Sequence, residues 1–150
     1  MINITQLKQL AQRIIDNTDA VHYEWITTES ELSKKMHKLS ASQFPLLVVV
    51  TPSYDAKATD EDNAWDINHL LFFVLKRDQF QGANETNNAA DMDQTLAIIK
   101  DIKNHLKNGF PDFQDCTLMN GIDPGSFHVD PEYNFLGCNG WSISFQIKTT

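Results

Sequence analysis

The sequence has few cysteines, glycines and basic residues, and each shortage excludes a class of protein. Cys116 and Cys138 lack the CxxC spacing of a zinc or redox site, so we expect two reduced, partly buried side chains. The six glycines form neither GxGxxG nor GxxxxGK, which excludes the usual phosphate-binding loops. Twelve Lys and Arg stand against twenty Asp and Glu, and this net charge of −8 disfavours a nucleic-acid partner.

Long hydrophobic runs are also missing. The longest, Phe44–Val50 and Leu70–Leu75, are much shorter than the roughly 20 residues that a membrane-spanning helix needs. The segment Met1–Thr5 has no basic stretch followed by an apolar run, so it does not resemble a secretory signal. We therefore expect no membrane partner and a cytoplasmic location. The length is that of a single domain over residues 1–150, and nine Phe, three Trp and three Tyr supply apolar area for its core.

Three segments have the spacing of amphipathic helices. The first covers Ile4–Asp16 and is capped by Asn3, and a second, short helix is predicted over Thr28–Leu39. The longest helix covers Ala89–Asn108 and ends before Gly109, which suits a left-handed position after a helix. The apolar face of this long helix is predicted to contain Met92, Leu96, Ile99, Ile102 and Leu106.

Four segments have the pattern of strands, and from Gln114 onward the chain is predicted to be β structure. Val21–Trp25 alternates as a half-buried strand does, and Phe44–Thr51 is apolar throughout, as a strand covered on both faces is. Ile67–Lys76 follows along the chain and is expected to pair antiparallel with the strand before it. Trp141–Lys148 alternates almost without fault. Between the second and third strands, Ser53–Asp66 is polar and acidic and is predicted to be an exposed loop.

The pairs Asn120-Gly121 and Asn139-Gly140 are typical of type I′ turns, so we expect hairpins at both places. The sequence lacks the strict strand–helix alternation of a doubly wound fold. It therefore predicts an α+β domain with a mainly antiparallel sheet. The N-terminal helix and the long helix of the C-terminal half are expected to pack on one face of that sheet.

Two histidine–carboxylate groups are the candidates for chemistry. His22 and Glu24 lie two residues apart on a predicted strand, so their side chains share a face. His128, Asp130 and Glu132 have the composition of a facial metal triad, although the intervening proline interrupts a regular strand. No further ligand is identifiable for either group. The favoured interpretation is solvent-facing strand residues for the first group and an ordinary β-turn region for the second.

The remaining motifs also favour structure over catalysis. The acidic loop has no glycine and lacks the D-x-D-x-D-G order of a calcium loop, so it is interpreted as solubilising. Gly125-Ser126 lacks the second glycine of a nucleophile elbow. We assign no catalytic, cofactor-binding or metal-binding residue and expect no cofactor.

The C-terminal segment Tyr133–Ile147, with Gly140-Trp141 leading into an alternating strand, resembles the closing strands of small phage and prophage virion proteins. The order of elements is similar to that of tail-completion and tail-terminator proteins. The resemblance implies a structural protein of the virion whose identical subunits associate into a ring through head-to-tail interfaces. It implies acidic loops that line a lumen or a docking face. It assigns no functional residue.

Two other functions remain open. The chain could be a cytoplasmic protein- or peptide-binding module, such as an acidic immunity-like protein, that holds its partner along a sheet edge. It could also be a small hydrolase that uses His22, His128 or Asp130, which would require those side chains to converge in a pocket.

Overall fold

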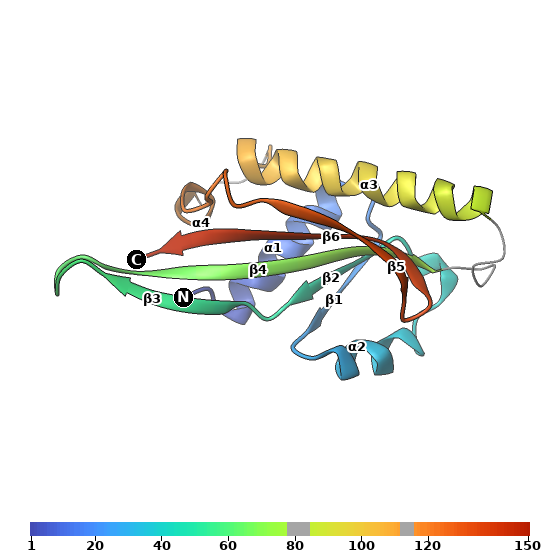
Figure 1. Cartoon of the computed structure of the whole chain (residues 1–150), viewed down its shortest axis with the longest axis horizontal. Coiled ribbons are helices and arrows are strands. Elements are labelled where there is room, and N and C mark those ends of the chain that lie inside the picture. Colours follow the sequence, from blue (N-terminus) through green and yellow to red (C-terminus); the bar gives the residue numbers. More distant parts are fainter. Residues whose placement is uncertain (78–84, 112–115) are drawn as a thin grey trace.

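The computed structural model describes residues 1–77, 85–111 and 116–150, and Figure 1 shows how its helices and strands are arranged. The helices are α1 Ile4–Asn17, α2 Glu29–Met36, the short 3₁₀ helix Ala41–Gln43, α3 Glu85–Asn108 and α4 Cys116–Asn120. The strands are β1 His22–Ile26, β2 Leu46–Val50, β3 Ser53–Ala58, β4 Ala64–Arg77, β5 His128–Phe135 and β6 Cys138–Thr149.

All six strands form one sheet in the order β1-β2-β4-β6-β5, and β3 pairs with β4 beside β2. β1 and β2 are parallel because the chain crosses over between them through α2, and every other pairing is antiparallel. β4 is the central strand. It pairs with β6 along one side, and with β3 and then β2 along the other.

Helices α1 and α3 pack on one face of this sheet, which confirms the predicted α+β architecture (Figure 1). The main hydrophobic core lies between them and the sheet, where Leu7 and Ile14 of α1 and Ile102 of α3 are fully buried. α1 starts where its sequence predicts. The Asn3 side chain accepts from the backbone N–H of Gln6, and the Gln6 side chain accepts from the backbone N–H of Asn3.

α2 lies on the opposite face and forms a second, smaller core. Leu32 and Met36 of α2 pack on Leu46 and Val48 of β2, and the buried Cys138 joins the same cluster. The side chain of Cys116 lies outside the described residues. Because α2 is short, it covers only β1, β2 and the adjacent ends of β4 and β6. Within the described part of the chain, no helix covers the rest of this face.

The predicted exposed loop over Ser53–Asp66 is wrong. Its first part is β3, its last part is the start of β4, and the two are joined by a turn at residues 59–63. Every side chain of β3 is exposed. Ser53–Ala58 does alternate polar and apolar residues, but its apolar positions are Tyr54 and two small alanines, so the strand signal is weak and the local sequence indicates a loop.

Both predicted type I′ turns are also wrong. Asn120 is the last residue of α4, and Asn139-Gly140 lies inside β6. The helix α4 also corrects the β structure predicted from Gln114 onward. The chain turns between β5 and β6 earlier, where Asn134, Leu136 and Gly137 have positive φ. Buried Asn139 instead accepts from the backbone N–H of Asn134, so its side chain supports the turn from within the next strand.

α3 begins at Glu85, four residues before the predicted start at Ala89, and ends as predicted before Gly109, whose φ is +89°. Ile99, Ile102 and Leu106 are buried as expected, together with Thr95 and Ile98. Leu96 is only half-buried. In the described ranges, none of the helices combines the length and apolar character needed to cross a lipid bilayer.

Candidate interaction edge and open sheet face

β1 forms one edge of the sheet. It pairs with β2 alone among the described strands, so the backbone groups on its other side have no strand to bond. Val21, just before β1, has 52% of its surface exposed although it is apolar. Free strand edges bind further strands readily, which makes this edge a candidate interaction site.

A groove of about 480 Å³ runs along this edge, and we call it the β1 groove. Its floor is β1 itself, one wall is formed by α1, and Lys35 of α2 forms the other wall. Residues lining it are Lys8, Gln12, Ile15, Val21, His22, Tyr23, Glu24, Trp25 and Lys35. The groove therefore combines unpaired backbone groups with aromatic and cationic side chains.

The predicted pair His22 and Glu24 forms the α2 side of the groove. His22 Nε2 lies 2.9 Å from Glu24 Oε1, and Lys35 Nζ lies 3.5 Å from the other carboxylate oxygen. Lys35 also donates to the backbone carbonyl of Trp25, while Lys8 lies 5.1 Å from the centre of the Trp25 ring on the opposite side. The shared face of His22 and Glu24 is confirmed. The two lysines were not found from the sequence, because they come from separate helices.

The second predicted group, His128, Asp130 and Glu132, lies on β5 at the other edge of the sheet. Their side chains share a face, and His128 Nε2 lies 3.0 Å from Asp130 Oδ2, with both side chains more than half exposed. Three strands separate this group from His22, so the histidines do not converge. In the described residues, no three His, Cys, Asp or Glu side chains are grouped as metal ligands. The region is a strand and not the predicted turn.

The face of the sheet that α2 leaves uncovered is formed by β3, β5 and much of β4 and β6, and we call it the open face. Trp65, Ile67 and Leu71 of β4 make a half-buried apolar stripe along its middle. His69, between them, contacts Asp55 of β3 at 3.0 Å. This hydrogen bond holds the pKa of the Asp55 carboxyl below its ordinary value.

Charged side chains lie at both ends of the open face. Lys57 and Lys148 lie near the 59–63 turn, where Lys57 pairs in register with Trp65 and Lys148 Nζ lies 4.3 Å from the centre of that ring. Asp130 and Glu132 lie toward the other end, opposite residues 142 and 140 of β6. The end near the turn therefore combines two lysines with the carboxylate of Asp55, whereas the β5 side of the other end carries two carboxylates.

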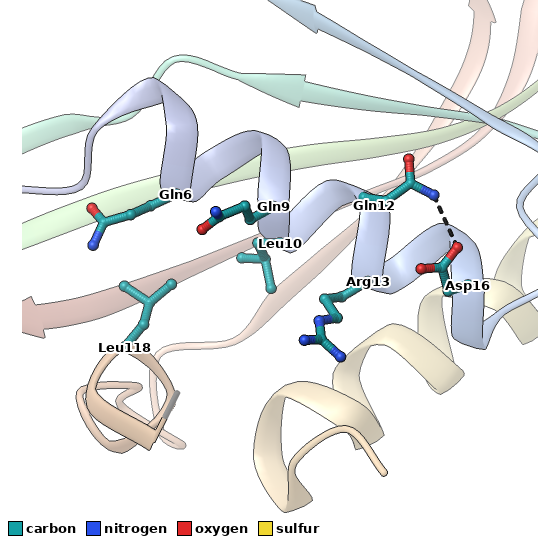
Figure 2. Close-up of a pocket in the computed structure, with 7 residues that line it drawn as sticks. All are labelled: Gln6, Gln9, Leu10, Gln12, Arg13, Asp16 and Leu118. Atoms are coloured by element: carbon teal, nitrogen blue, oxygen red, sulfur yellow. Dashed lines mark hydrogen bonds between the residues drawn. The ribbon is translucent and has the colours of Figure 1, made fainter. Parts of the chain in front are cut away.

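A second hollow, of about 430 Å³, lies between α1 and α4 (Figure 2). Leu10 and Leu118 form its apolar part, and the side chains around them are mainly glutamine amides of α1. Figure 2 shows Gln12 bonded to Asp16 at 2.9 Å, so this carboxylate is engaged within its own helix. The hollow holds neither of the predicted histidine groups.

Sequence comparison adds no relative to this description: the chain matches no known protein-family model and no curated protein.

Proposed function

We propose that this protein is a non-catalytic assembly protein that joins other protein chains through the free edge of β1. In its most specific form, identical copies associate head to tail into a ring of a phage or prophage tail module, as the resemblance to tail-completion and tail-terminator proteins implies. The observation that supports it is the β1 groove, which offers an unpaired strand between two helices.

The direction of the strands supports the head-to-tail form. β1 and β5 form opposite edges of the sheet, and β5 runs antiparallel to β1 when the pairings are followed across it. A second copy placed with its β5 beside β1 would continue the sheet with an antiparallel pair, the more stable kind. Such a contact uses two different surfaces, so repetition closes a ring or extends a filament.

To test this proposal, light scattering measures the molar mass of the 17.1 kDa chain at rising concentration, and electron microscopy shows the shape of any assembly. The expected result is a closed oligomer of several copies. Val21→Glu places a charge at the mouth of the groove and should shift the protein to smaller species. Tyr54→Ser is the control, since Tyr54 is exposed on β3, which does not pair with β1.

A peptide that copies β5, residues 128–135, tests the contact directly. It should shift the amide resonances of β1 and compete with assembly, and a scrambled peptide should do neither. A chain that stays monomeric at high concentration and ignores the β5 peptide would contradict the head-to-tail form.

The same groove favours a second function, the binding of an extended segment of a different protein. The walls from α1 and α2 leave room for one more strand, which is how peptide-binding modules use a sheet edge. A monomeric wild type that binds a host protein, with Val21→Glu abolishing that binding, would support this function in place of the ring.

A further inference from the structure

The histidine–carboxylate pairs of the two edge strands determine how one copy aligns on the next. We propose that β1 and β5 of two copies join in a single register. In this register His22 of one copy lies directly opposite Asp130 of the next, and Glu24 lies opposite His128. The inference rests on the head-to-tail form of the proposed function, and it adds the residues that select the second copy and fix its alignment.

The backbone of β1 has groups free for this pairing. Thr51 donates its N–H to the carbonyl of Ile26, so Ile26 directs its backbone groups toward β2. Because the direction alternates along a strand, Tyr23 and Trp25 direct theirs to the free side of the sheet. Lys35 of α2 donates to the Trp25 carbonyl from that side. The N–H and carbonyl of Tyr23 therefore face the position of an added strand.

Pro131 indicates the matching side of β5. Proline has no backbone N–H and is tolerated on an edge strand where that position faces away from the ladder. Pro131 therefore directs its backbone away from β6, and Val129 shares this direction by alternation. The proposed register places Val129 opposite Tyr23, so the two residues can exchange both N–H···O bonds. It places Pro131 opposite Val21, whose own N–H already donates to the carbonyl of Pro45.

The faces of the two copies also match. His22 and Glu24 share a face with Ile26, which packs in the core under α2. His128 and Asp130 lie on the open face, which is the uncovered part of that same face. A copy moved sideways across the sheet, with its strand directions kept, therefore continues both faces. Among the described helices, α1 and α3 lie on the other face, so α2 meets no helix of the next copy beside β5 (Figure 1).

Charge selects one register among those that the backbone allows. His22 Nε2 lies 2.9 Å from Glu24 Oε1, and His128 Nε2 lies 3.0 Å from Asp130 Oδ2. Each edge therefore carries a histidine and a carboxylate two residues apart. In the proposed antiparallel register, each histidine meets a carboxylate of the other copy as well as its own. Histidine and carboxylate then alternate around a square of four side chains, which stabilises the pairing of the strands.

Other registers lose this match. A shift of two residues in one direction places Glu24 opposite Asp130, and carboxylates directly opposite each other are destabilising. The same shift in the other direction places His22 opposite His128 and leaves Glu24 opposite Ser126. A shift of one residue would set the polar side of one edge beside the apolar side of the other. The proposed register alone pairs both histidines with carboxylates.

The charges around the two edges favour the same contact. Lys8 and Lys35 line the β1 groove together with a single carboxylate, Glu24. β5 carries Asp130 and Glu132 and has no lysine or arginine. A groove with an excess of lysine thus meets an acidic strand, and the association should weaken as salt is raised.

Exchange of the two side chains within an edge tests the register, with sedimentation equilibrium of the full-length chain as the measurement. His22→Glu with Glu24→His keeps the composition and net charge, but it sets like groups opposite each other, so the contact should weaken about tenfold. His128→Asp with Asp130→His should weaken it similarly. All four changes in one chain should restore assembly, because every histidine again meets a carboxylate of the next copy.

The exchange on β5 also separates the proposed register from the shifted ones. In either shifted register it would replace a like pair, Glu24 with Asp130 or His22 with His128, by a pair of opposite kind. Assembly would then become stronger. Weakening is expected only in the proposed register, so an unchanged or stronger assembly of this variant would overturn the proposal.

Peptide binding shows whether the variants fold. The chain with the β1 exchange should bind a residue 128–135 peptide that carries the β5 exchange, and it should bind the wild-type peptide about tenfold more weakly. Equal binding of both peptides, or a four-change chain that fails to assemble, would overturn the register. If Val21→Glu still abolished assembly in that case, the proposed edge contact would stand. A wild type that stays monomeric and ignores the wild-type peptide would overturn both.

Discussion

At the scale of single residues, Asn139 and Gly140 show what the sequence could not reveal. The pair is typical of a turn, yet both residues lie near the start of β6, in register with Lys76 and Leu75 of β4. Asn139 is fully buried and bonds to Asn134, five residues earlier and across the hairpin. Gly140 is needed because the backbone of Val74 lies directly against it. Asn134 lies outside the four residues of a turn, and Val74 lies far along the chain, so local turn statistics include neither contact.

Gly140→Ala should therefore destabilise the protein. A Cβ at this position would lie 1.9 Å from the carbonyl oxygen of Val74, and backbone cannot move aside as a flexible side chain can. We expect the free energy of unfolding, measured by urea denaturation, to fall by at least about 1–3 kcal/mol. Gly125→Ala is the matched control, because its nearest neighbour would be the Asp123 carboxylate at 3.4 Å. Equal midpoints for the two variants would contradict the close approach.

The Asp55–His69 pair predicts a titration. The hydrogen bond from His69 lowers the pKa of Asp55, and the charges of His69 and Lys57 add to this against the opposing effect of burial. Because the pKa is lower in the folded state, the pair stabilises the fold fully at a pH above the ordinary aspartate pKa. This stabilisation is lost as the pH falls through the lowered pKa. Carboxyl-carbon NMR should show His69→Ala raising the Asp55 midpoint. The change His128→Ala, on the other edge strand, should leave it in place.

At the scale of elements, helices were predicted more accurately than the first hairpin. The helices carry caps and an apolar face within a few turns of chain, as with Asn3 and Gln6 at the start of α1. β3 alternates polar and apolar residues, but its apolar positions are only Tyr54 and two alanines, so the pattern is too weak to distinguish a strand from a loop, and the pairing with β4 lies beyond this local pattern. The earlier start of α3 was missed because its first residues are polar.

The packing of α3 predicts a large effect of a single core residue. Ile102 is fully buried between α3 and the sheet, so Ile102→Ala should cost about 2–5 kcal/mol through lost burial and the cavity left behind. Lys100→Ala, on the exposed side of the same helix, should change the free energy of unfolding by no more than about 0.5 kcal/mol. Chemical denaturation of both variants measures the difference, and similar costs would mean that α3 is not anchored by this face.

At the scale of the whole molecule, the sequence predicted that helices pack on a sheet, but it did not predict which strands form the edges of that sheet. Two helices on one face follow from amphipathic patterns, whereas the position of a strand in the sheet depends on long-range pairing. Val21–Trp25 alternates as an interior or an edge strand would, so neither the β1 groove nor its lysine walls could be read from it. The charged side chains of the open face likewise come from three different strands, β3, β5 and β6.

The central place of β4 has a consequence for how the native state opens. Its backbone is hydrogen-bonded on both sides along most of its length, to β6 on one side and to β3 and β2 on the other. Its amide protons should therefore exchange with deuterated solvent only through global unfolding, whereas those of β3 and β5 should exchange through local fraying. Residue-resolved exchange would show this as a gradient of protection that falls from the middle of the sheet outward.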